Sequence, residues 1–149
     1  MVKISNPEAS AAFNATWDLL DKTDRTAAED RLMLTLAHTS RYLWQANGGP
    51  KQWSIGDWQI SRAYAALGQA ELARSFAGSA LDLATDPALE PFLLAAAHEG
   101  MARALALANS PLSAQHADQA RKLATALSDP EDAQVILSDL SQHHPDPIA

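Results

Sequence analysis

The apolar residues of this chain recur at every third or fourth position, and no segment alternates apolar and polar residues over a sustained length. The first spacing is typical of amphipathic helices and the second of strands, so the pattern predicts an all-α protein. Breaks in the pattern divide the chain into seven helices joined by short loops, and we expect consecutive helices to lie antiparallel. The predicted helices span residues 7–21, 26–46, 54–67, 70–84, 88–108, 112–127 and 130–142.

Signals for helix ends support this division. Asn, Asp or Ser is followed by proline at several predicted starts, where the side chain can accept a hydrogen bond from an unpaired N–H and proline has none to lose. This pair occurs at residues 6–7, 86–87, 110–111 and 129–130. Thr26 and Glu29 form a capping box at the second helix. Residues 47–50, Asn-Gly-Gly-Pro, break the chain, and Gly68 ends another helix.

The apolar positions within each helix form stripes that we expect to face a core. The second to fourth helices carry the stripes Leu32–Leu36–Leu43, Ile60–Ala63–Tyr64–Leu67 and Ala73–Ala77–Ala80–Leu81. Many of the apolar residues are small, since the chain has 31 alanines and only two valines. This composition favours helices that pack at close range over a core of bulky strand residues.

Charge and composition exclude several classes of function. The net charge is −7 without any basic run, so neither nucleic acid nor an anionic membrane surface is an expected partner. The chain has no cysteine, which excludes disulfides, thiolate nucleophiles and cysteine-based zinc sites. The N-terminal residues lack the apolar region of a signal peptide, and no apolar run is long enough to span a bilayer. We therefore expect a cytoplasmic protein.

The third and fourth predicted helices, residues 54–87, resemble a tetratricopeptide (TPR) repeat, a helical hairpin of about 34 residues. The resemblance rests on these residues: Trp58, Ile60, Ser61 and Tyr64 before Gly68, then Ala73, Ala77 and Ala80. Residues 88–127 are a weaker copy and residues 7–46 a divergent one. The resemblance implies a single TPR-like domain over 1–149, a stack of three hairpins with a capping helix at 130–142. The chain also resembles small bacterial helical-repeat proteins.

The TPR resemblance implies a concave groove lined by the first helix of each hairpin. In this register Trp58 and Arg62 fall on the lining, away from the stripe of the same helix. His98 lies 36 residues after Arg62, close to one repeat length, and is expected at the equivalent position. Arginine offers a planar donor fork for a carboxylate, and tryptophan offers a flat apolar wall. The alternative is a packed indole covered by an arginine stem.

A second polar face lies on the second predicted helix, where His38, Arg41 and Tyr42 share one side with Gln45. This face either extends the groove or holds the helices together, with Arg41 paired to an acid. We expect the protein to bind a peptide segment, a protein partner or a small anionic molecule, without a cofactor.

Two other functions stay open. His38, His98 and Glu99 are the side-chain types that acid–base catalysis uses, and Glu99 lies among alanines, where a buried carboxyl is either paired or raised in pKa. The spacing of these residues predicts no metal site. The third possibility is a scaffold that assembles as a homo-oligomer through its terminal hairpins. His143 and His144 belong to a tail that we expect to be solvated.

Overall fold

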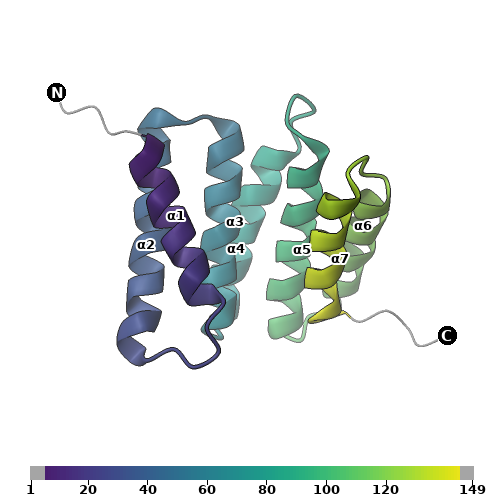
Figure 1. The fold of residues 1–149 in the computed structure, drawn as a ribbon. Coiled ribbons are helices and arrows are strands. Elements are labelled where there is room, and N and C mark those ends of the chain that lie inside the picture. Colours follow the sequence, from purple (N-terminus) through teal and green to yellow (C-terminus); the bar gives the residue numbers. More distant parts are fainter. Residues whose placement is uncertain (1–5, 145–149) are drawn as a thin grey trace.

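The computed structural model describes residues 6–144, and between them the fold is all-α, as predicted (Figure 1). Seven helices follow one another along this part of the chain. They are α1 (Asn6–Leu20), α2 (Ala27–Asn47), α3 (Pro50–Ala66), α4 (Ala70–Ala84), α5 (Pro91–Leu107), α6 (Ser113–Thr125) and α7 (Pro130–Ser141). None of these helices is long and apolar enough to cross a membrane.

Two of the predicted helix starts are wrong. Helix α3 begins at Pro50, four residues before the predicted start, because Gly49 is the N-cap and its N–H donates to the side chain of Gln52. Helix α5 begins at Pro91, after a turn at residues 86–89 in which the carboxylate of Asp86 accepts the N–H of Ala88. In both helices proline occupies the first turn, where its missing N–H costs nothing.

The helices stack in order, each against the next in the chain (Figure 1). The backbones of the odd-numbered helices also approach one another, α1 with α3, α3 with α5 and α5 with α7. Between residues 6 and 144 no two even-numbered helices come as close, although the ring of His38 in α2 packs edge-on against that of Phe76 in α4. Helices in direct mutual contact must form the inner layer of the stack, and helices held apart must form its outer layer. The inner layer of α1, α3, α5 and α7 is therefore where a groove can form.

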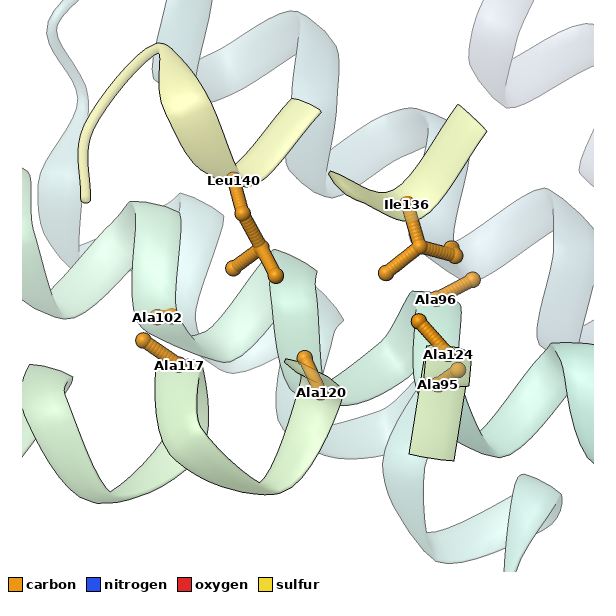
Figure 2. Close-up of a cluster of buried hydrophobic side chains, with 8 residues drawn as sticks. All are labelled: Ala95, Ala96, Ala102, Ala117, Ala120, Ala124, Ile136 and Leu140. Carbon is orange, nitrogen blue, oxygen red and sulfur yellow. The ribbon is translucent and has the colours of Figure 1, made fainter. Parts of the chain in front are cut away.

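Alanines make up much of the core, so the helices approach closely. One cluster of buried side chains joins α5, α6 and α7 (Figure 2). Its members are Ala95, Ala96, Ala102, Ala117, Ala120, Ala124, Ile136 and Leu140. At Gly100 of α5 an added Cβ would lie only 3.3 Å from Cδ1 of Trp58 in α3, so the absence of a side chain permits this contact.

The predicted stripe of α2 is shifted by one position. Leu32 is 49% exposed, and the buried residues of this helix are Met33, Ala37, Ser40 and Trp44. The predicted stripes of α3 and α4 are better placed, because Ile60, Ala63, Ala73, Ala77 and Ala80 are fully buried. In α2 leucines occur on two neighbouring sides of the helix, so spacing alone did not distinguish which side faces α1 and α3.

Candidate functional site

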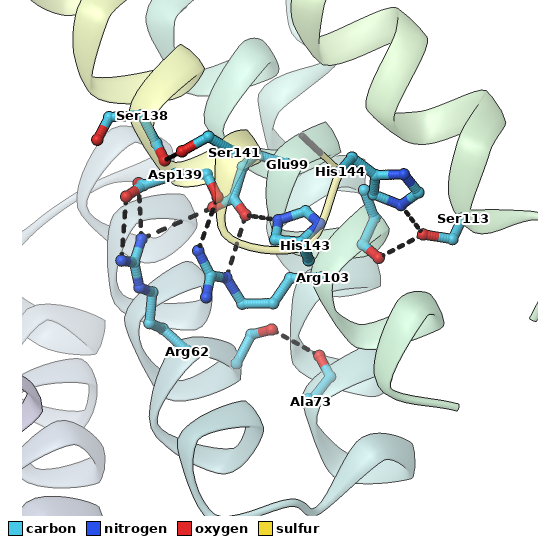
Figure 3. Close-up of polar contacts among 12 residues, drawn as sticks. Arg62, Ala73, Glu99, Arg103, Ser113, Ser138, Asp139, Ser141, His143 and His144 are labelled. Carbon is cyan, nitrogen blue, oxygen red and sulfur yellow. Dashed lines mark hydrogen bonds and ion pairs between the residues drawn. The ribbon is translucent and has the colours of Figure 1, made fainter. Parts of the chain in front are cut away.

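Arg62 lies near the C-terminal end of α3 and is held in place by three helices. Its two terminal nitrogens donate to both carboxylate oxygens of Asp139 in α7, Nη1 to Oδ2 at 2.7 Å and Nη2 to Oδ1 at 3.1 Å (Figure 3). The guanidinium carbon lies 5.2 Å from the ring centroid of Trp17 in α1, a cation–π distance. Burial acts to lower the pKa of Arg62, but the negative charges of Asp139 and Glu99 outweigh it. The pKa of Arg62 therefore lies above its ordinary value, and the side chain stays positively charged.

Glu99 of α5 is fully buried beside Arg62. Its Oε2 accepts hydrogen bonds from Nε of Arg103 at 3.1 Å and from Nε2 of His143 at 2.8 Å (Figure 3). Its Oε1 lies 3.7 Å from Nη1 of Arg62 and accepts no hydrogen bond among residues 6–144. Burial acts to raise the pKa of Glu99, but the hydrogen bond from His143 and the charges of Arg103 and Arg62 outweigh it, and the pKa lies below its ordinary value.

Of the two possibilities for Glu99, the structure selects the paired carboxylate. A catalytic acid or base at neutral pH needs a pKa raised toward 7, and here the neighbouring cations hold the group ionised. Glu99 therefore neutralises charge at the junction of α3, α5 and α7. Asp139, which is also mostly buried, has the same role toward Arg62.

A cavity of about 580 Å³, which we name the arginine cavity, opens beside this network. Arg25, Arg62 and Arg103 line it together with Trp17 and Asp21. The other lining residues are Leu20, Ala65, Ala66, Ala106, Leu107, Gln142 and His143. The last turns of α1, α3 and α5 and the end of α7 all contribute, so the odd-numbered helices run in the same direction. Helix C-termini carry partial negative charge, which the three arginines partly offset.

Each arginine of this cavity retains N–H groups for a further acceptor. Nε of Arg25 donates to Asp30, and its Nη1 lies within hydrogen-bonding distance of the backbone oxygens of Leu19, Leu20 and Lys22. In the described part of the chain, Nη2 of Arg25 and Nη1 of Arg103 have no acceptor, and neither does Nε of Arg62. A guanidinium has five N–H donors, so these groups can bind carbonyl or carboxylate oxygens.

A second cavity of about 320 Å³, the aromatic cavity, lies along the same inner layer. Its lining residues are Phe13, Trp17, Lys51, Ser54, Ile55, Trp58, Glu90, Phe92, Leu93 and Ala96. Trp17 lines both cavities, so they adjoin at its indole. The arginine cavity lies toward the C-terminal ends of α3 and α5, and the aromatic cavity toward their N-terminal ends.

Trp58 is both a core residue and a cavity wall. Its ring centroid is 5.6 Å from that of Trp17. It packs against the core cluster of α5, α6 and α7 and against a second cluster between α4 and α5, made of Ala80, Ala84, Leu93 and Ala97. Its Nε1 is buried and has no hydrogen-bond partner among the described residues. The structure thus places Trp58 and Arg62 on the inner layer, but at two adjoining cavities. Trp58 is packed against the core, as the alternative expected, whereas the guanidinium of Arg62 lies over Trp17 and not over Trp58.

The structure does not bring His98 to this surface. Nδ1 of His98 lies 3.0 Å from Nδ1 of His116 in α6, and neither cavity is lined by His98. The α5 residue that meets Arg62 is Glu99, one position further along. Successive residues of a helix point about 100° apart around its axis, so a difference of one position is enough to turn His98 away from Arg62.

The polar face of α2 is separate from both cavities. Nε of Arg41 donates to Oδ1 of Asp57 in α3 at 2.9 Å, so Arg41 pairs with an acid, which was one of the two possibilities. His38 is hydrogen-bonded through Nε2 to the hydroxyl of Tyr64 at 3.0 Å. Tyr42 is 69% exposed beside His38 in a shallow hollow on the outer surface. These three residues do not extend the groove. The structure also does not bring the three candidate acid–base residues together, because His38 is bonded to Tyr64, His98 to His116 and Glu99 to Arg103 and His143.

Five further residues belong to the candidate site without having been expected there: Trp17, Arg25, Arg103, Asp139 and His143. His143 was expected to be solvated, but its side chain is only 10% exposed and is bonded to Glu99. His144 likewise contacts Ser113 of α6. One signal was available, because Glu99 and Arg103 are the only charged residues in the otherwise apolar helix α5. The residues after 144 lie outside the described part of the chain.

Comparison with known proteins adds no assignment. No family model, no curated protein and no solved structure matches the chain.

Proposed function

We propose that this chain is a TPR-like binding module of the cytoplasm that holds a peptide segment along its inner layer. The proposal rests on one observation: Trp17 lines both the aromatic cavity and the arginine cavity, so the two cavities adjoin. Their volumes, about 580 and 320 Å³, fall in the range of small-ligand sites. An apolar side chain would fill the aromatic cavity, and an acceptor group a few ångströms along the same ligand would meet the arginines.

The charge of the arginine cavity favours a peptide over a small free anion. Three guanidinium groups line it, but Asp21 lies on the same wall, Glu99 and Asp139 neutralise Arg62 and Arg103, and four helix ends add partial negative charge. The net field is therefore weak, although unused N–H donors are abundant. Such a surface suits backbone carbonyls and single carboxylates, which are bound by directed hydrogen bonds more than by net charge.

This proposal replaces several of the residues expected from the sequence. Trp17 joins Trp58 as the apolar wall, and Arg25 and Arg103 join Arg62 as the donors. Arg41, Tyr42, His38 and His98 have no part in it, because they lie on other surfaces of the structure.

The test uses tryptophan fluorescence with two blocked dipeptides as probes. One contains phenylalanine followed by aspartate, and the other contains phenylalanine followed by asparagine. We expect both to bind, with the aspartate peptide favoured by about three- to tenfold, since one charge-assisted hydrogen bond is offset by the acids of the same cavity. If neither peptide binds at millimolar concentration, the proposal is wrong.

A variant that fills the arginine cavity supplies the control for location. Ala66 is exposed and lines the cavity, so Ala66→Trp should block it without disturbing the buried network. Ala114 is also an exposed helical alanine but lies on α6, away from both cavities, and Ala114→Trp is the matched control. Binding should weaken at least tenfold in the first variant and stay unchanged in the second. Equal effects in the two variants would place the peptide elsewhere.

A further inference from the structure

His98 and His116 form a pair of imidazoles outside the proposed binding site. They project from the neighbouring helices α5 and α6, both are half-buried, and their Nδ1 atoms are 3.0 Å apart. The ring centroids are 5.2 Å apart, so the two nitrogens face each other almost directly. At this separation one nitrogen donates and the other accepts, so only one N–H lies between the two rings. No carboxylate is bonded to either ring among residues 6–144.

Both rings are neutral at physiological pH. Burial, together with the charge of His116, lowers the pKa of His98 to about 4, and burial also lowers the pKa of His116. Neutral imidazole is the form that binds metal ions, because each ring then has a lone pair available. Protons therefore compete weakly for this pair at neutral pH.

From this geometry we propose that His98 and His116 form a two-histidine site for a divalent transition-metal ion that joins α5 to α6. Imidazole nitrogen suits Cu²⁺, Ni²⁺ and Zn²⁺, and excludes Mg²⁺ and Ca²⁺, which prefer oxygen. No third histidine, aspartate or glutamate completes a metal cluster in the part of the chain that the structure describes. The remaining coordination positions are left to water.

The spacing of the two nitrogens is compatible with both binding a single ion. With metal–nitrogen bonds of about 2.05 Å, two nitrogens 3.0 Å apart subtend about 95° at the ion. This is near the right angle between neighbouring ligands of tetragonal Cu²⁺, whereas a tetrahedral Zn²⁺ site needs nitrogens about 3.3 Å apart. Each ring has to turn so that both lone pairs converge on the ion, and the shared hydrogen passes to Nε2 of its own ring. Because this movement can change the separation by a few tenths of an ångström, the separation does not distinguish the ions. We expect Cu²⁺ to bind more tightly than Zn²⁺ because Cu²⁺ has the higher general affinity for nitrogen ligands.

The test is titration of the wild-type protein with Cu²⁺ at pH 7.4, followed by calorimetry and by the visible absorption of the bound ion. His98→Gln and His116→Gln should each lose one equivalent of tight binding, with affinity reduced at least tenfold. His38→Gln and His144→Gln are the matched controls and should keep that equivalent, since both are histidines outside the pair. Circular dichroism of each variant without metal establishes that it is folded.

A second measurement does not depend on the variants. In ¹⁵N-labelled wild-type protein, the Nδ1 resonances of His98 and His116 should shift together as Zn²⁺ is added. The proposal is overturned if these resonances do not move, or if His98→Gln and His116→Gln keep the full stoichiometry. It is also overturned if only His144→Gln loses binding, because the ion then belongs to the C-terminal histidines.

Discussion

The ion pair between Arg62 and Asp139 fastens α7 to α3, and its removal tests how the inner layer is held together. The two residues are 77 positions apart, and both side chains are mostly buried, at 14% and 13% exposed. A second ion pair supplies a comparison within the same protein. Lys51 of α3 and Glu90, just before α5, also connect distant parts of the chain, but their side chains are 47% and 60% exposed.

The structure sets the expected magnitudes. Two unit charges about 4 Å apart attract by about 4 kcal/mol at an effective dielectric constant of 20. Solvent at the exposed edges of both side chains screens part of this attraction, so we expect a coupling free energy of about 2 kcal/mol for Arg62 and Asp139. Exposed pairs contribute well below about 1 kcal/mol, and we expect that for Lys51 and Glu90.

The assay is a double-mutant cycle in which urea unfolding and thermal unfolding are both followed by circular dichroism. Its members are Arg62→Gln, Asp139→Asn and the double variant, and a parallel cycle uses Lys51→Gln and Glu90→Gln. At about 2–4 °C per kcal/mol for a chain of this size, Asp139→Asn should lower Tm by about 4–8 °C. If the two cycles give equal coupling energies, burial does not strengthen the Arg62–Asp139 pair and the reasoning is refuted.

Two further predictions concern α5 and its neighbours. His98 has a pKa of about 4 in the folded protein and about 6.5 when unfolded, so the unfolded chain binds more protons between these pH values. The free energy of unfolding should therefore fall as pH falls from 6.5 toward 4, and His98→Gln should reduce this dependence on pH. An unchanged dependence in the variant would contradict the lowered pKa of His98. Gly78→Ala should stabilise the protein by about 0.5–1 kcal/mol, because an added Cβ meets nothing within 4 Å. Gly100→Ala should stabilise it less or destabilise it, because the added Cβ would lie 3.3 Å from Cδ1 of Trp58. Equal increases in thermal stability for the two variants would contradict the close packing of α5 on α3.

Much of the candidate site lay beyond prediction because its contacts join distant parts of the chain. Spacing identified Arg62 and Trp58 as unusual residues on one side of α3, and both line cavities of the inner layer. No local pattern indicates that Asp139 meets Arg62, since that contact depends on how α7 returns across α3 and α5. The same holds for Trp17, whose position between two cavities follows from the packing of α1 on α3.

The sequence by itself determined the helices, because helix periodicity, capping boxes and proline at first turns act within a few residues of one another. The capping box of Thr26 and Glu29 is present, and α7 begins at Pro130 after the cap Asp129, as those local rules require. The buried sides of α3 and α4 also followed from spacing, but only the tertiary structure decided which side of α2 is buried and which residue of α5 meets Arg62. In α2 the buried residues include Met33 and Trp44 in place of the predicted leucines. In α5 the residue that meets Arg62 is Glu99 and not His98. Both outcomes depend on the positions and charges of the neighbouring helices.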